Sequence, residues 1–194
     1  IEGTALNQRL CLLHWLRRAL RLCPQFVSHQ FTPALKTALK QHGIARPLYD
    51  DANLRALIGF CSRKLQRQFE CRDVQFLQLY LQYCLIQHQL GNTPQFSHVQ
   101  RSWTQSRGEY FTAQEIVRHW RRRVPQGAHG DEQLFLALLF MMLRTPDPVL
   151  DKHQQDQRLR RAIVRMVARF RSQTGMNFSD EQGLTDQLYI HLAQ

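Results

Sequence analysis

Residues 73–90 read DVQFLQLYLQYCLIQHQL, and this stretch predicts the central helix of an all-helical fold. After Asp73 it contains no Asp, Glu, Lys or Arg, and apolar side chains occupy most of its circumference. A helix that is apolar on nearly all sides is buried among other elements. We expect Asp73 to cap this helix and Gly91 to end it. The glutamines form one narrow stripe at helical spacing that should reach the surface or a partner: Gln75, Gln78, Gln82 and Gln89.

The composition is that of a folded chain with a basic surface. Of the 194 residues 43% are hydrophobic, which is enough for a core in one or two domains. The formal net charge of +11 favours an anionic partner, although it says nothing about the fold. We find neither a signal peptide nor a membrane span, and we expect a cytoplasmic location. The chain begins without methionine, which indicates a segment of something longer.

The residues that most often bind metals do not form a recognisable site. No C-x-x-C or H-E-x-x-H motif occurs, so we predict no metal and no cofactor. The cysteines are odd in number and widely spaced, and most lie in helical patterns on apolar faces. We interpret them as buried free thiols of a reducing compartment: Cys11, Cys23, Cys61, Cys71 and Cys84.

Catalysis also lacks a motif, since neither a nucleophile elbow nor a phosphate-binding glycine loop is present. We therefore predict no catalytic residue. The carboxylates Glu115, Asp131 and Glu132 are interpreted as acids at helix starts, where the helix dipole favours them. The histidines inside helices are interpreted as structural residues with satisfied hydrogen bonds: His14, His88 and His119.

Hydrophobic periodicity predicts further helices on both sides of the central one. Thr32 and Pro33 should open one helix as N-cap and first-turn proline. Thr112 and Glu115 form a T-x-x-E capping box before another. The clearest boundary is at 145–148, where two alternating prolines forbid a continuing helix. The predicted helices cover residues 5–22, 33–43, 51–68, 113–124, 134–143, 151–172 and 181–193.

The helix predicted at 151–172 is basic and amphipathic. Its apolar face contains Leu159, Ile163, Val167 and Phe170. The opposite stripe is formed by Arg158, Arg161, Arg165 and Arg169. Such a stripe could bind nucleic acid through phosphate contacts, with strongly salt-dependent affinity. A solvated helix face explains the same pattern, because basic faces are common on helices and no aromatic residues alternate with these arginines for base stacking.

The closing stretch FSDEQGLTDQLYIHLAQ resembles the start of a PTS regulation domain (PRD), found in bacterial antiterminators and transcription activators. Leu188, His191 and Leu192 match the L-x-x-H-L pattern of the family's first helix. The resemblance implies that His191 is a phospho-acceptor for proteins of the phosphotransferase system. It also implies that the region before this stretch is a first PRD.

Residues 77–87 are similar to the same helix of that first domain. Tyr80 stands at the histidine position and Gln87 at the position of an arginine. The helix at 113–124 resembles the family's later A-x-x-I helix. Residues 131–143 are similar to its E-x-G-x-x-x-x-H helix, with Leu139 at the second histidine position. The resemblance therefore implies that both phospho-acceptors of the first domain are replaced.

The resemblance implies an antiparallel helical bundle of PRD type. The implied order is an N-terminal helix after a winged-helix domain (1–29), a degenerate PRD (30–148), a basic linker helix (149–174) and the start of a second PRD (175–194). Tyr80 and Leu139 would either form an apolar dimer surface or fill the monomer core.

The implied function is that of a non-enzymatic regulatory module for signal relay or dimerisation. The expected partners are a second copy, a protein of the phosphotransferase system or another regulator, and DNA or RNA through domains outside this chain. The alternative is an adaptor that binds nucleic acid or protein through the Arg158–Arg171 face. A helical enzyme without a recognisable motif ranks third.

Overall fold

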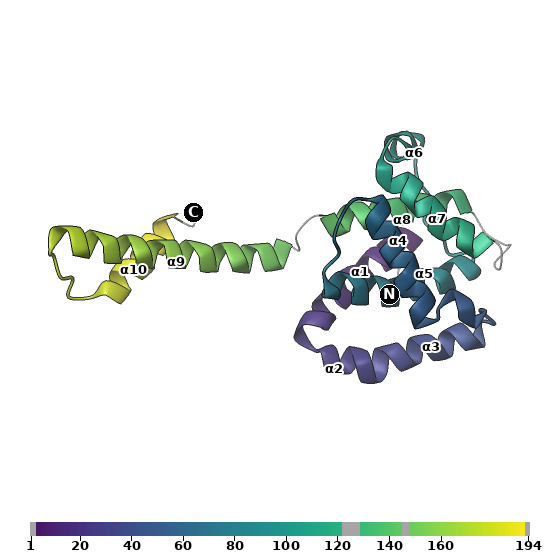
Figure 1. Ribbon diagram of the computed structural model, residues 1–194, viewed down its shortest axis with the longest axis horizontal. Helices are drawn as coiled ribbons and strands as arrows, with labels where there is room; N and C mark the ends of the chain where they lie inside the picture. Colours follow the sequence, from purple (N-terminus) through teal and green to yellow (C-terminus); the bar gives the residue numbers. More distant parts are fainter. Residues whose placement is uncertain (1–2, 122–128, 145–147, 193–194) are drawn as a thin grey trace. The chain divides into compact units, whose positions relative to one another are not determined.

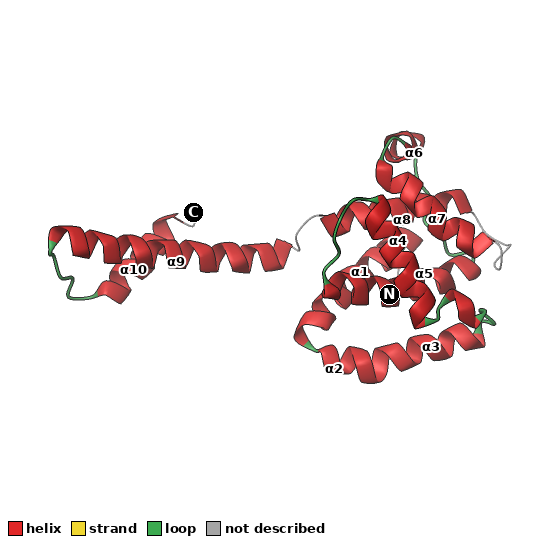
Figure 2. Ribbon diagram, in the orientation of Figure 1, coloured by secondary structure: helices red, strands yellow, loops and turns green. Residues whose placement is uncertain are grey.

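The computed structural model describes residues 3–121, 129–144 and 148–192, and these residues form helices and no strand (Figure 1 and Figure 2). The prediction of an all-helical fold is confirmed for these ranges. In chain order the helices are α1 (Ala5–Leu22), α2 (Pro24–Phe26), α3 (Thr32–Gln41), α4 (Asp51–Lys64), α5 (Cys71–Gln89), α6 (His98–Gln105), α7 (Gly108–Arg121), α8 (His129–Arg144), α9 (Pro148–Thr174) and α10 (Glu181–Leu192). Contacts divide the chain into two compact units, Ile1–Arg144 and Thr145–Gln194.

Helix α5 is the centre of the first unit, as its sequence predicts. Leu77, Leu81 and Leu85 are each at most 1% exposed, and the helix packs against α1, α3 and α4. Its N-cap is Glu70 rather than Asp73, because the two residues form a reciprocal capping box with Asp73 at the third helical position. The helix ends before Gly91, whose φ of 72° suits a residue without a Cβ.

The second apolar helix, α8, is also buried and packs closely against α7. Phe135 and Phe140 lie in the core, and the Phe135 ring centre is 6.4 Å from that of Tyr80 on α5. The two apolar helices, α5 and α8, therefore meet through their side chains.

Helix α1 belongs to the same core, since Leu13 and Leu16 are buried beside α5. Helix α1 therefore lies in the same compact unit as the helices that follow it. After α1 the chain runs from α2 through a π-helical turn, Val27–Phe31, directly into α3 (Figure 2).

Thr32 does not cap α3, because its N–H and its hydroxyl both donate to the carbonyl of Val27. We attribute the wide turn to Pro33, which lacks an N–H and whose ring would clash with the carbonyl four residues earlier in a regular helix.

The capping box expected at Thr112 and Glu115 is also wrong. Helix α7 begins at Gly108, and the Thr112 hydroxyl donates to the Gly108 carbonyl from inside the helix. Glu115 instead accepts a hydrogen bond from Lys64 on α4 at 3.0 Å.

The second unit is an antiparallel hairpin of α9 and α10 joined by a turn with Gly175 at φ 69°. Two exposed ion pairs connect the helices, Arg160 to Asp186 at 3.1 Å and Arg171 to Glu181 at 2.8 Å. Residues 145–147 of the predicted boundary lie outside the described residues. Among the described helices, none has the length and apolar character needed to cross a bilayer.

Candidate functional site

The two positions that the PRD resemblance assigns to replaced histidines lie in the core of the first unit. Tyr80 and Leu139 are each 0% exposed. The Tyr80 hydroxyl donates to the backbone carbonyl of Arg9 at 2.5 Å, and burial raises the pKa of Tyr80. Of the two alternatives, an apolar dimer surface or the monomer core, both residues therefore belong to the core. They form no exposed apolar surface, which corrects the idea of a dimer interface at this place.

Beside Tyr80 lies a buried polar cluster that joins α1, α5 and α8. Arg9 and Glu132 are both fully buried and form a two-pronged ion pair, in which Arg9 Nη2 donates to Glu132 Oε2 at 2.9 Å and Arg9 Nη1 donates to Oε1. The Thr93 hydroxyl donates to Oε2 at 3.2 Å, and His88 Nδ1 lies 3.3 Å from the same oxygen. Arg9 also donates to the Asn92 carbonyl at 3.0 Å.

The electrostatics of this cluster keep Glu132 ionised. Burial alone would raise the pKa of Glu132, but the hydrogen bond with His88 and the positive charge of Arg9 outweigh it and hold the pKa below its usual range. The guanidinium of Arg9 also lies 4.8 Å from the centre of the Phe135 ring. The charges are thus paired with each other and surrounded by apolar groups, an arrangement that fixes three helices in place.

The sequence analysis interpreted Glu132 only as an acid at a helix start and did not predict its ion pair with Arg9. Asp131 and Glu132 both lie in the first turn of α8, as predicted, and Asp131 is partly exposed and accepts a hydrogen bond from Arg101 at 2.6 Å. One signal pointed to the cluster. Arg9 precedes Leu13 and Leu16 by four and seven residues, so it lies on the buried face of its helix.

The cysteines are free, but the expectation that they are buried is wrong for three of the five. Cys61 and Cys84 are buried, and burial raises the pKa of Cys61 to about 12. Cys11, Cys23 and Cys71 are exposed. Within the described ranges, no three His, Cys, Asp or Glu residues come together in a way that could hold a metal ion.

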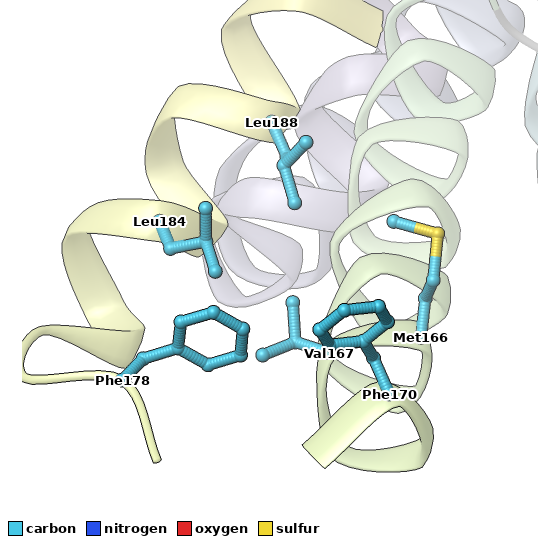
Figure 3. Close-up of a pocket in the computed structure, with 6 residues that line it drawn as sticks. All are labelled: Met166, Val167, Phe170, Phe178, Leu184 and Leu188. Atoms are coloured by element: carbon cyan, nitrogen blue, oxygen red, sulfur yellow. The ribbon is translucent and has the colours of Figure 1, made fainter. Parts of the chain in front are cut away.

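In the second unit, an apolar pocket of about 200 Å³ lies between α9 and α10 and is partly open to solvent. Figure 3 shows its six lining side chains pointing toward one another from both sides: Met166, Val167, Phe170, Phe178, Leu184 and Leu188. His191 follows Leu184 and Leu188 by seven and three residues on α10, so it lies on the same helical face as these leucines. It is exposed in the structure.

The basic face of α9 is solvent-accessible. All four arginines named from the sequence are exposed: Arg158, Arg161, Arg165 and Arg169. Two other arginines of α9, Arg160 and Arg171, pair with α10 instead, and the Arg160 guanidinium lies 4.2 Å from the centre of the Tyr189 ring.

The fold and these sites define an all-helical protein with a compact bundle and a two-helix unit that exposes a basic stripe and a histidine. Over all 194 residues it is 61% identical to the stationary phase-inducible protein CsiE of Escherichia coli (strain K12). The chain spans 46% of the length of that protein. No protein-family model matches the chain, and no solved structure matches it.

Proposed function

We propose that this chain is a non-enzymatic regulatory module of a cytoplasmic transcription regulator or antiterminator of the PRD kind, acting in stationary phase. The support is the PRD resemblance of its helices together with the 61% identity to CsiE, whose name describes a protein induced in that phase. DNA or RNA would be bound by domains outside this chain. A protein of the phosphotransferase system, or another regulator, would deliver the signal.

One observation carries the proposal, namely the different accessibility of the three family positions. Tyr80 and Leu139 are buried and have side chains that cannot form a phosphohistidine, whereas His191 is exposed on α10. The first unit therefore serves as a fixed support. The second unit is the one that can receive a phosphoryl group.

A phosphate on His191 would act on the packing of the hairpin. A phosphoryl group adds close to two negative charges, and charge placed beside apolar side chains weakens their packing. His191 lies on the α10 face that contributes Leu184 and Leu188 to the apolar pocket. Phosphorylation is thus expected to loosen the contact between α9 and α10.

The test is a phosphotransfer reaction with the full chain and purified phosphotransferase-system proteins, followed by peptide mass spectrometry under conditions that preserve phosphohistidine. The expected result is phosphate on His191, lost in His191→Ala and retained in His153→Ala. Phosphate on His88, which is buried in the first unit, or no phosphate at all would refute the proposal.

The proposed partner of the hairpin is a second copy of the chain. Two helices bury few side chains, and units this small are commonly completed by oligomerisation. Several large apolar side chains of the hairpin stay about half exposed or more: Val164, Met166, Phe170, Ile190 and Leu192.

Sedimentation at micromolar concentration tests this dimer. Ile190→Asp should shift the chain toward monomer, whereas Val99→Asp, at an even more exposed site on α6 of the first unit, should leave it unchanged. A parent chain that is monomeric throughout, or equal behaviour of the two variants, would rule the dimer out.

The basic face supports a second candidate function, a nucleic-acid or protein adaptor. Four exposed arginines along α9 could neutralise up to four phosphates, which gives a steep dependence of affinity on salt. Binding of a short DNA or RNA duplex across a salt series, compared between the parent and Arg161→Gln/Arg165→Gln, tests it. Absence of measurable binding at low salt would remove the nucleic-acid form of this candidate.

A further inference from the structure

The glutamine stripe of α5 lines a polar pocket in the first unit. Gln75, Gln78 and Gln82 meet Arg55 from α4 and Lys36 from α3 around a volume of about 210 Å³. This space could hold about seven water molecules, so it suits a small ligand rather than a drug-sized one. Three of the four glutamines of the stripe that we expected to reach the surface therefore line this pocket, and Gln89 does not.

The most deeply buried of these glutamines, Gln82, has a side-chain oxygen that accepts no hydrogen bond from the described residues. Gln82 is 1% exposed, and its Nε2 donates to the Gln78 carbonyl at 2.8 Å. Because a carbonyl can accept only from the amide nitrogen, this bond fixes which side-chain atom of Gln82 is the oxygen. That oxygen, Oε1, has no hydrogen-bond partner among the residues that the structure describes. Oε1 itself is buried, but Gln82 lines the pocket, so a donor that enters beside it would reach the oxygen through a small shift of the side chain and would satisfy the unpaired acceptor.

The rim of the pocket is positively charged. Arg55 is exposed and forms no ion pair within the described ranges. Lys36 bonds to Asp51 at 3.3 Å, but both side chains of this pair are about half exposed, so it can yield to a ligand. A neighbouring hollow shares Lys36 and Asp51 and adds Lys40, Arg46 and Asp50, so the cations around the two hollows, with Arg55, outnumber the carboxylates. The local charge therefore attracts an anion toward the pocket.

We propose that this pocket binds a small organic anion that carries a hydroxyl group next to its charged group. The anion would bind Arg55 and Lys36, and the hydroxyl would donate to Gln82 Oε1. Polyol phosphates and hydroxy acids share this chemistry. This ligand site is independent of the phosphate proposed on His191, because it is built from the Val27–Phe31 turn, α3, α4 and α5, all of the first unit.

Calorimetric titration of the full chain with matched probes tests the site. Glycerol 3-phosphate and inorganic phosphate form one pair, and glycerate and propionate form the other, so each pair compares an anion with and without a carbon-borne hydroxyl. We expect the hydroxylated member of at least one pair to bind about tenfold more tightly than its partner, as one extra hydrogen bond to a buried acceptor would give. The pair that responds identifies the anion as phosphate or carboxylate.

Two variants locate the binding and two controls check it. Gln82→Met removes the acceptor at nearly constant size, and Arg55→Gln removes the exposed cation, so each should weaken binding about tenfold. Gln89→Met, on the same stripe, and Arg63→Gln, on the same helix as Arg55, do not line the pocket and should bind like the parent. Absence of binding for all four probes, or equal binding by Arg55→Gln and Arg63→Gln, would overturn the proposal. Arg55→Gln decides the test even if Gln82→Met unfolds.

Discussion

Replacing Glu132 with glutamine should destabilise the first unit strongly, because it leaves the buried Arg9 without a counter-ion. Both side chains of this pair are 0% exposed. Removal of one partner from a buried ion pair costs roughly 3–5 kcal/mol, which is a large part of the ~5–15 kcal/mol that stabilises a typical domain. Glutamine has a single acceptor oxygen, so only one of the two Arg9 hydrogen bonds could persist, as a weaker neutral bond. The other would be lost because an amide nitrogen cannot accept, and the guanidinium would stay desolvated.

Urea unfolding followed by tryptophan fluorescence measures this loss in the right part of the chain. All three tryptophans, Trp15, Trp103 and Trp120, belong to the first unit, so their signal is independent of hairpin unfolding. Asp131→Asn is the matched control, since Asp131 is the adjacent residue and its pair with Arg101 is partly exposed. Such a pair contributes about 0–1 kcal/mol.

If the free energies of unfolding of Glu132→Gln and Asp131→Asn differ by less than about 1 kcal/mol, the buried cluster does not hold the three helices together, since a surface ion pair contributes that much. A double variant separates charge from packing. Arg9→Met/Glu132→Leu should be more stable than Glu132→Gln, because replacing both charges by apolar groups removes the desolvation cost.

The same cluster predicts a pH dependence. Burial alone would raise the pKa of Glu132, but His88 and Arg9 together lower it in the folded state. The carboxylate in the unfolded chain titrates near pH ~4.3. The folded pKa is the lower of the two, so the stabilisation is complete above about pH 4.3 and is lost as the pH falls through the folded value. The stability gap between the parent and Glu132→Gln should therefore narrow in acid.

Three further outcomes are expected from the core. Leu81→Ala on α5 should cost ~2–5 kcal/mol in the same urea assay, and a loss under ~1 kcal/mol would mean that α5 is not the centre of the bundle. Tyr80→Phe should lower the free energy of unfolding by ~1 kcal/mol, because the hydrogen bond to the Arg9 carbonyl is lost. Tyr83→Phe, at a half-buried site, is the control, and a larger loss of stability there than in Tyr80→Phe would contradict this prediction. A thiol reagent at pH ~8 should label the three exposed cysteines of the native chain, Cys11, Cys23 and Cys71. Cys84 should stay unlabelled because it is buried and burial raises the pKa of its thiol, so labelling of Cys84 would contradict the structure.

The existence of α5 was predictable because its signal lies within one helix. Its apolar circumference requires burial whatever surrounds it, and its leucines are buried. The helix that starts at Asp51 was predictable for a similar reason, because Asp50 lies directly before it and accepts a hydrogen bond from the Asn53 N–H. Both features depend on neighbouring residues only.

The starts of α5 and α7 were predicted less well, because other residues before the predicted N-cap also begin the helix. Glu70 and Asp73 together satisfy the start of α5 three residues earlier than Asp73 alone. Thr112 and Glu115 match a capping box, yet α7 already begins at Gly108, and Glu115 pairs with Lys64 instead. A short motif fixes a helix start only when the preceding residues do not continue the helix themselves.

The buried cluster could not be predicted from spacing, since 123 residues separate Arg9 from Glu132. Sequence patterns give the face of each helix but not which faces meet. An arginine on an otherwise apolar face still carries partial information. Such a residue must find a counter-charge or reach the surface, so the sequence could have predicted a buried acid without naming Glu132.

The position that the PRD resemblance assigns to a phosphate is linked directly to this cluster. Tyr80 donates to the backbone of Arg9, and the side chain of Arg9 pairs with Glu132. A negative charge at position 80 would therefore compete with Glu132 for one guanidinium in a site without solvent, which favours unfolding over a second folded state. A conformational response is less costly in the hairpin, where Arg160–Asp186 and Arg171–Glu181 are exposed and individually weak. If this chain changes its packing in response to a signal, the change begins between α9 and α10.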